Sequence, residues 1–95
     1  FTPVQNQINS IINERKRLMD ELSKFSSLTV YPSNSNFILF MDSNGGDQLF
    51  TTLKKNGILL RNLGSHPRLK NCLRVTIGTP PENDQFLDQL RKAVS

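Results

Sequence analysis

Two arginines occupy corresponding positions in two strands that the sequence predicts. The segment Cys72–Ile77 alternates between apolar and polar residues, which places Arg74 on the face opposite the apolar side chains. Arg61 ends the preceding predicted strand, Ile58–Arg61, and has the same relation to the apolar residues of that strand. A hairpin near the symmetric register would therefore set Arg61 and Arg74 opposite each other on one face of the sheet.

Two like charges directly across a sheet repel each other, so this arrangement needs a reason. A guanidinium forms paired hydrogen bonds with a carboxylate or a phosphate, and an anion between Arg61 and Arg74 would make their proximity favourable. The two arginines therefore predict an anion-binding site. The spacing alone leaves two simpler interpretations open: both side chains reach solvent, or Asp and Glu side chains neutralise them.

Other residues with reactive or ligand-binding side chains support weaker predictions. The chain has no GxGxxG motif, no Walker loop and no pair of Cys or His residues at metal-ligand spacing, so no metal ligand is predicted. Gly45-Gly46 precedes a predicted helix and could hold a phosphate, although a turn with a helix cap is favoured. His66 is expected to be an exposed loop residue, and Cys72 a packed, unreactive thiol.

The composition fits one small domain. The 95 residues include 12 Lys and Arg against 8 Asp and Glu, a net charge of +4 that is compatible with an anionic partner. The densest basic run, Arg15–Arg17, is expected to be a solvated helix face rather than a phosphate-binding patch. The lone Cys72 cannot form an intrachain disulfide, and no apolar run approaches the roughly 18–20 residues of a membrane span. Without an initiator Met or a signal peptide, the sequence predicts a domain excised from a longer cytoplasmic protein.

The elements that must position the two arginines follow from periodicity and capping. Thr2-Pro3 with Gln5 predicts a helix start, and an apolar stripe that includes Ile8 then indicates about six helical turns. Thr79-Pro80-Pro81-Glu82 predicts a second capping box, which opens a terminal helix. The other predicted elements are strands at Leu28–Tyr31, Asn36–Met41, Ile58–Arg61 and Cys72–Ile77, a helix at Asp47–Lys55 closed by Asn56-Gly57, and a loop at Asn62–Asn71.

The predicted order of elements, αββαββα, indicates an α+β domain in which helices flank a small, mainly antiparallel sheet. The nearly continuous apolar run Asn36–Met41 is typical of a strand covered on both faces. The segment Asn36–Arg61 would form a right-handed β–α–β unit if its two strands were parallel neighbours.

Two segments around the arginines resemble a known family. Gly57–Leu63, GILLRNL, matches the pattern G-I-hydrophobic-hydrophobic-R, and Asn71–Asn83, NCLRVTIGTPPEN, matches N-C-L-R-(I/V)-T-(I/V)-G-T-P-x-E-N. Both are similar to the C-terminal signature of histidinol-phosphate aminotransferases. Asn36-Phe37 and Arg17 also suit that family, so the resemblance runs along essentially the whole chain.

The resemblance implies that residues 1–95 are the C-terminal small domain of a fold-type-I, class II aminotransferase. Such an enzyme is a homodimer whose large domain, absent here, holds pyridoxal phosphate on a Schiff-base lysine. Arg74 would grip the α-carboxylate of glutamate or 2-oxoglutarate, and Arg61 would help to bind the phosphate ester of histidinol phosphate. No lysine of this chain lies in a Schiff-base context, so no catalytic or cofactor-binding residue is expected and the chain alone would be inactive. His66, Arg68 and Lys70 depart from the family pattern and leave its fine specificity open.

Other functions compete with this interpretation. The nearest is a small domain of a related aminotransferase that acts on aromatic or other amino acids. A basic α+β module that binds nucleic acid would need aromatic residues on a sheet face to stack bases, and Tyr31 and Phe37 do not form such a pattern. A structural dimerisation domain built on the long first helix is the third alternative. The aminotransferase interpretation itself involves no nucleic-acid or membrane partner.

Overall fold

The computed structural model describes residues 3–33 and 35–94, with side chains from Ser10 onward. These residues form α1 (Pro3–Leu22), β1 (Leu28–Val30), β2 (Phe37–Asp42), α2 (Gly46–Lys55), β3 (Leu60–Asn62), the short 3₁₀ helix η1 (Pro67–Leu69), β4 (Cys72–Thr76) and α3 (Pro80–Val94). The predicted order αββαββα is confirmed, with η1 added inside the predicted loop. The predicted cap Thr2 and the side chains of Gln5 and Ile8 lie outside the described residues.

The four described strands form one antiparallel sheet in the order β1-β2-β4-β3. β2 and β4 pair at its centre, from Phe37 opposite Thr76 to Met41 opposite Cys72. β1 pairs with the other side of β2, and β3 pairs with the other side of β4. The predicted α+β class with an antiparallel sheet is confirmed. Because β4 separates β2 from β3, those two strands are not neighbours, and the condition for a β–α–β crossover is not met.

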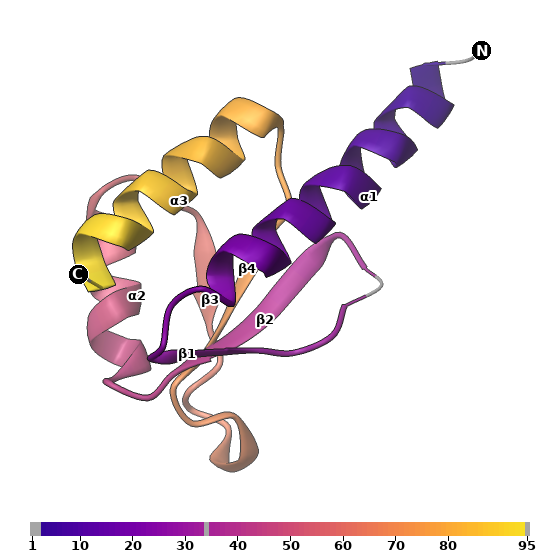
Figure 1. The fold of residues 1–95 in the computed structure, drawn as a ribbon. Helices are drawn as coiled ribbons and strands as arrows, with labels where there is room; N and C mark the ends of the chain where they lie inside the picture. Colours follow the sequence, from indigo (N-terminus) through magenta and orange to yellow (C-terminus); the bar gives the residue numbers. More distant parts are fainter. Residues whose placement is uncertain (1–2, 34, 95) are drawn as a thin grey trace.

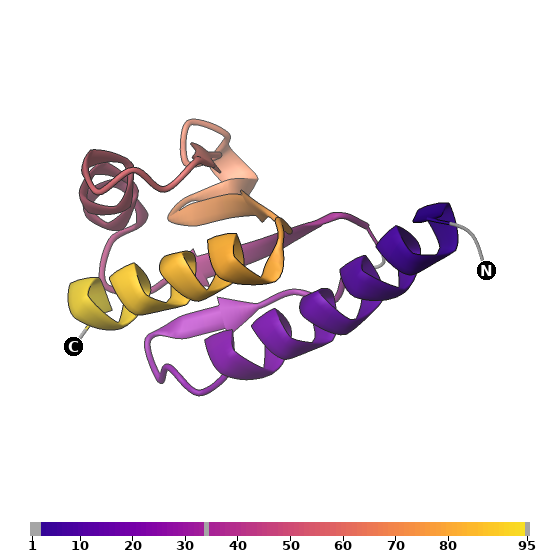
Figure 2. The same ribbon diagram turned by 90° about the horizontal axis from the view of Figure 1, so that it is seen from above.

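The helices pack on one face of the sheet through a single cluster of buried side chains, and α1 and α3 lie side by side in a parallel orientation (Figures 1 and 2). Alternate residues of the two central strands enter this cluster: Ile38 and Phe40 from β2, and Leu73 and Val75 from β4. Full burial of one such side chain stabilises the fold by roughly 1.5–3 kcal/mol. The cluster therefore determines which face of each central strand turns away from the helices.

The opposite face of β2 is only partly covered within the described chain. Phe37, Leu39 and Met41 are half-buried there, whereas Ile38 and Phe40 on the helix side are fully buried. The prediction of a strand covered on both faces is therefore wrong for these residues. The apolar run reflects a covered inner face and an outer face that is apolar but open.

β3 begins two residues later than predicted because the end of α2 uses the intervening backbone. Gly57 adopts a left-handed conformation with a φ of 85°, which confirms the predicted cap. The N–H of Ile58 then donates to the carbonyl of Leu53 at 3.0 Å, so Ile58 belongs to the helix cap rather than to the ladder. Leu59 follows with 91% of its surface exposed.

The predicted capping box at the start of α3 is confirmed. The N–H and the hydroxyl of Thr79 donate to one carboxylate oxygen of Glu82, at 3.0 Å and 2.9 Å. The N–H of Glu82 donates back to the Thr79 hydroxyl at 3.5 Å. These bonds, led by the one from the Thr79 backbone, hold the pKa of Glu82 below its usual value. The cap fixes where the chain leaves β4 and enters the last helix.

Candidate anion-binding site

Arg61 and Arg74 are direct partners in the β3–β4 ladder, so the predicted register is confirmed. Direct partners in an antiparallel pair place their side chains on the same face of the sheet. That face points away from the helices, because the residues on either side of Arg74 lie in the core. The two arginines line an open depression of about 290 Å³ together with Leu59, Leu60 and Thr76.

Neither arginine has a counter-charge in the described part of the chain. The ion pairs found among the described residues all involve other cations, namely Arg17, Lys24, Arg91 and Lys92. No hydrogen bond joins the guanidinium of Arg61 or of Arg74 to another described residue. Neutralisation by Asp or Glu is therefore excluded within residues 10–33 and 35–94. Two adjacent, uncompensated cations create a local potential that favours an anion.

The two arginines differ in their surroundings. Arg74 is half-buried on the inner strand β4, and its Cζ atom lies 5.0 Å from the centre of the Phe37 ring. Arg61 is exposed on the edge strand β3. Arg74 is therefore the more constrained of the two cations, and Arg61 has more freedom to follow a ligand.

The loop between β3 and β4 is anchored beside the ladder, which keeps the two arginines in register. The N–H of Leu63 donates to the carbonyl of Cys72 at 3.0 Å, continuing the hairpin for one more step. Asn71 adopts a left-handed backbone with a φ of 64°, and its carbonyl accepts a 3.0 Å hydrogen bond from the N–H of Asp42. Asparagine tolerates this conformation better than most residues do. The loop is thus tied to β2 as well as to its own hairpin.

Gly46 provides a second anchor for the same loop. Its N–H donates to the side-chain oxygen of Asn71 at 3.1 Å, and a Cβ atom on Gly46 would lie only 2.6 Å from the Cα of Asn71. The close approach requires glycine here. Gly45 caps α2, so the turn and helix cap predicted at Gly45-Gly46 are confirmed. Because the Gly46 N–H is already bonded, it is not available to a phosphate.

Asn83 fixes the turn that follows β4. Its side-chain oxygen accepts from the N–H of Gly78 at 2.9 Å, and its amide donates to the Gly78 carbonyl at 3.0 Å. The same amide donates to the carboxylate of Glu14 on α1, also at 3.0 Å. Asn83 is buried, so these bonds satisfy groups that would otherwise lack partners. The last residue of the sequence motif around Arg74 therefore has a structural role, which its polar type alone did not indicate.

Glu14 and Arg17 connect α1 to α3. Arg17 donates to both carboxylate oxygens of Glu14, at 2.7 Å and 3.0 Å, and forms an ion pair with Asp84 at 2.8 Å. The hydrogen bonds from Arg17 lower the pKa of Glu14 against an opposing effect of burial, and they raise the pKa of Arg17. The expectation of a solvated basic face is therefore wrong at Arg17. The spacing of Glu14 and Arg17, three residues apart on a helix, was the available sign of this pair.

The remaining candidate residues show no arrangement for chemistry. His66 is exposed, as expected, and its Nδ1 atom accepts from the N–H of Arg68, which caps η1. Cys72 is buried, as expected. Among the described residues, no group of three or more His, Cys, Asp and Glu side chains could hold a metal ion. None of the helices in the described part is long and apolar enough to cross a membrane.

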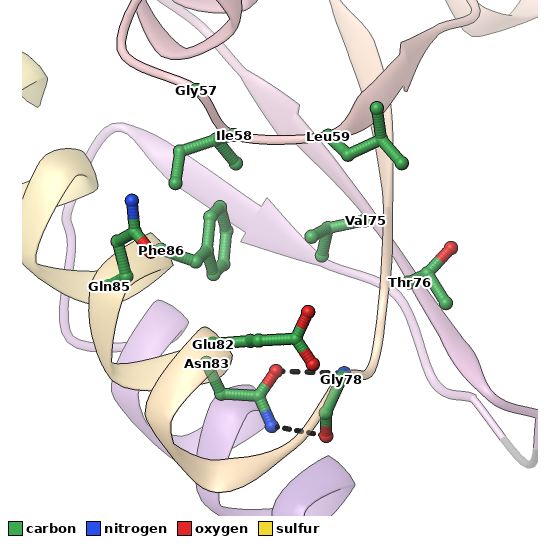
Figure 3. A pocket seen from close by; sticks show the side chains of 10 residues that line it. All are labelled: Gly57, Ile58, Leu59, Val75, Thr76, Gly78, Glu82, Asn83, Gln85 and Phe86. Atoms are coloured by element: carbon green, nitrogen blue, oxygen red, sulfur yellow. Dashed lines mark hydrogen bonds between the residues drawn. The ribbon is translucent and has the colours of Figure 1, made fainter.

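A second depression, of about 230 Å³, lies between the segment before β3 and the first turns of α3 (Figure 3). Ile58, Val75 and Phe86 form its apolar wall, and Leu59 and Thr76 separate it from the arginine site. Its main polar groups already bond within the chain: Glu82 to Thr79 and Asn83 to Gly78. The space by itself therefore does not indicate a polar ligand, and the arginine face is the better candidate site.

The fold agrees with comparisons to known proteins. The family model for aminotransferases of class I and II matches residues 3–90. The chain belongs to this family. It is 44% identical over 90 residues to the histidinol-phosphate aminotransferase of Neisseria gonorrhoeae (strain NCCP11945), covering 94% of the chain and 25% of that protein. It is 34% identical over 91 residues to the histidinol-phosphate aminotransferase of Aquifex aeolicus (strain VF5), covering 96% and 26%.

The fold of this aminotransferase-family chain also matches that of a solved structure. The crystal structure of the histidinol-phosphate aminotransferase from Clostridium acetobutylicum matches it with a TM-score of 0.85 and 28% identity, over 94% of this chain and 28% of that one. The resemblance identified in the sequence motifs is thereby confirmed. The chain spans about a quarter of the length of the curated relatives that it matches.

Proposed function

We propose that this chain is the C-terminal small domain of a pyridoxal-phosphate-dependent transaminase. The proposed reaction converts histidinol phosphate and 2-oxoglutarate to imidazole acetol phosphate and glutamate. The similarity to two histidinol-phosphate aminotransferases over nearly the whole chain supports this substrate pair. The proposal includes a separate large domain, a homodimeric enzyme and a cytoplasmic location.

The observation that carries the proposal is the pairing of Arg61 with Arg74, without a counter-charge among the described residues. Placing two cations opposite each other is unfavourable unless an anion lies between them. Both substrates of the proposed reaction are anions. The fork of Arg74 suits the α-carboxylate of glutamate, and Arg61 on the edge strand adds the charge that a phosphate ester needs.

The residues of this chain do not fit pyridoxal phosphate itself. That cofactor requires a lysine for its Schiff base, and all six lysines here are exposed. None of the described residues that line the arginine depression is acidic. We therefore assign the cofactor and the bond-making steps to another part of the protein. The contribution of this domain is to bind the substrate anion and orient the rest of the molecule.

Transamination of other amino acids is the nearest alternative, because an arginine that grips an α-carboxylate serves any amino-acid substrate. The role of Arg61 distinguishes transamination of histidinol phosphate from transamination of other amino acids. This arginine is not needed for a single carboxylate, but it supplies a second positive charge when a phosphate ester takes the place of the carboxylate. A nucleic-acid module is the alternative from another class, and direct binding measurements distinguish it.

The experiment is a kinetic comparison of the full-length protein with its Arg74→Ala variant. We expect unchanged cofactor absorbance and a loss of roughly 100-fold or more in kcat/KM for both amino donors, as for the loss of a bidentate charged contact. Arg91→Ala is the matched control, because Arg91 is an exposed arginine that pairs with Glu21 on the helix side. Unchanged kinetics in Arg74→Ala would remove this residue from the site. Tight binding to RNA without transamination would favour the nucleic-acid alternative.

A further inference from the structure

The Phe37 ring is the one described side chain with a specific contact to the guanidinium of Arg74. The Arg74 Cζ atom lies 5.0 Å from the ring centre, within the range of a cation–π interaction. The contact follows from the sheet register. Phe37 is opposite Thr76, two residues along β4 from Arg74, and such diagonal neighbours are within reach of long side chains.

The backbone of Phe37 is held in place on both sides, which fixes the point from which the ring projects. Its carbonyl accepts a hydrogen bond from the hydroxyl of Ser33. The carbonyl of the preceding residue, Asn36, accepts a 2.8 Å hydrogen bond from the N–H of Ile77. The head of β2 is thus tied to the end of β4, the strand that carries Arg74. The half-buried ring therefore projects from backbone that is fixed relative to the strand of Arg74.

A ring contact differs from an ion pair in what it leaves available. A carboxylate partner would use the N–H groups of Arg74, whereas an aromatic face attracts the cation and leaves the N–H groups free. A guanidinium stacked in this way keeps its planar fork for a bidentate anion. It also loses less rotamer freedom when the anion binds, because part of the ordering has already occurred.

We infer that Phe37 is a positioning residue for the anion site, which holds the guanidinium of Arg74 in the orientation that receives the substrate carboxylate. This inference rests on the proposed function, because the carboxylate belongs to the proposed substrates. Phe37 acts through Arg74 and does not itself contact the reacting atoms. Loss of the ring should weaken carboxylate binding without altering the cofactor.

The test is the binding of 2-oxoglutarate to the full-length protein by titration calorimetry, together with steady-state KM and kcat for glutamate. Phe37→Leu removes the ring but keeps an apolar side chain, and Phe37→Tyr keeps the ring. We expect Phe37→Leu to weaken the dissociation constant and raise KM by about five- to tenfold, with kcat changed less than twofold. Phe37→Tyr should stay within about twofold of the unaltered protein in both measurements.

Phe50→Leu is the matched control. Phe50 is also half-buried, and Lys54 lies over its ring at 5.7 Å, but it belongs to α2 and packs against the core on the helix side. It should lower thermal stability while leaving 2-oxoglutarate binding unchanged. A double-mutant cycle completes the design: in an Arg74→Ala background, Phe37→Leu should have no further effect on binding.

The outcomes separate the two proposals. If the unaltered protein binds 2-oxoglutarate and Phe37→Leu binds it equally well, the positioning role is wrong and the proposed function is untouched. An equal effect of Phe37→Leu in the presence and absence of Arg74 also overturns the positioning role, because it shows a general structural loss. A protein that neither binds 2-oxoglutarate nor transaminates would overturn the proposed function, and this inference with it.

Discussion

The side-chain amide of Asn83 donates a 3.0 Å hydrogen bond to the carboxylate of Glu14, which lies 69 positions earlier in the chain. This bond connects the turn after β4, and therefore the strand that carries Arg74, to the first helix. Arg17 and Asp84 continue the contact by their 2.8 Å ion pair, and Glu21 pairs with Arg91 farther along the same two helices. The parallel packing of α1 and α3 is thus specified by polar contacts at three successive levels, in addition to the apolar core.

Replacing Asn83 with Ala should loosen this connection. The change leaves the Gly78 N–H without its partner, at a cost of about 1–3 kcal/mol. It also removes one hydrogen bond from the buried Glu14 carboxylate, which Arg17 still binds. We expect faster amide hydrogen exchange at the start of α3 and in the middle of α1 of the full-length protein, measured by mass spectrometry. Asn44→Ala is the control, because Asn44 is exposed and its side chain makes no described hydrogen bond. Unchanged exchange in Asn83→Ala would contradict the assigned role.

The contact between Glu14 and Arg17 should make the stability of the domain depend on pH in the acidic range. Hydrogen bonds from Arg17 and Asn83 outweigh burial and lower the folded-state pKa of Glu14 below its usual value of 4.5. A group with a lowered folded pKa stabilises the protein fully above the unfolded pKa and loses this contribution as the pH falls through the folded pKa. Stability should therefore decline below about pH 4.5.

Glu14→Gln tests this dependence, because glutamine keeps most of the hydrogen bonds but cannot titrate. The melting temperature of the full-length protein should exceed that of Glu14→Gln near neutral pH, and the difference should shrink below about pH 4.5. Glu21→Gln serves as the comparison: its pKa is also lowered, chiefly by Lys24, but the pair is on the surface and should contribute less. A difference that stays constant with pH would show that the Glu14 charge does not matter.

Features that depend only on segments adjacent in the sequence could be predicted from the sequence. The alternation around Arg74 and the hairpin between two successive strands predicted its pairing with Arg61, and the residues from Thr79 to Glu82 predicted the start of the last helix. Features that depend on strand order were not predictable. The contact between Phe37 and Arg74 exists only because β4 inserts beside β2, and periodicity does not specify the order of strands in a sheet. The bond between Asn83 and Glu14 likewise requires two helices to pack in one particular register.

The later start of β3 has a related reason. The segment Ile58–Leu60 is apolar and suits a strand. The N–H of Ile58, however, donates to the end of the preceding helix and is not available to the strand ladder. Local propensity favours a strand here, but the carbonyl groups at the end of the preceding helix require hydrogen-bond donors from the residues that follow. Leu59 is left with most of its surface exposed beside the arginine site, a position that its apolar type did not suggest.

A side chain at Gly46 should disturb the anchor of the loop between β3 and β4. The added Cβ of Gly46→Ala would meet the backbone of Asn71 at 2.6–2.7 Å, and backbone atoms cannot move aside cheaply. We expect a loss of about 1–3 kcal/mol and faster hydrogen exchange at Asp42 and in residues 63–71. Gly57→Ala is the matched control: its φ of 85° makes Ala costly by about 1–2 kcal/mol, but no atom lies within 4 Å of the added Cβ. Similar exchange in the loop for both variants would argue against the Gly46 anchor.

The difference in exposure between Arg61 and Arg74 predicts a difference in substrate dependence. A carboxylate can be held by the single fork of the more constrained Arg74, whereas a phosphate ester carries more charge and a third oxygen, which an arginine on the edge strand can reach. In the full-length protein, Arg61→Ala should therefore lower kcat/KM for histidinol phosphate by roughly 10- to 100-fold and for glutamate by only a few-fold. Arg68→Ala, which removes an exposed arginine from the adjoining loop, should change both values less than Arg61→Ala does. Equal losses for the two substrates in Arg61→Ala would mean that Arg61 supports the site generally and does not distinguish a phosphate from a carboxylate.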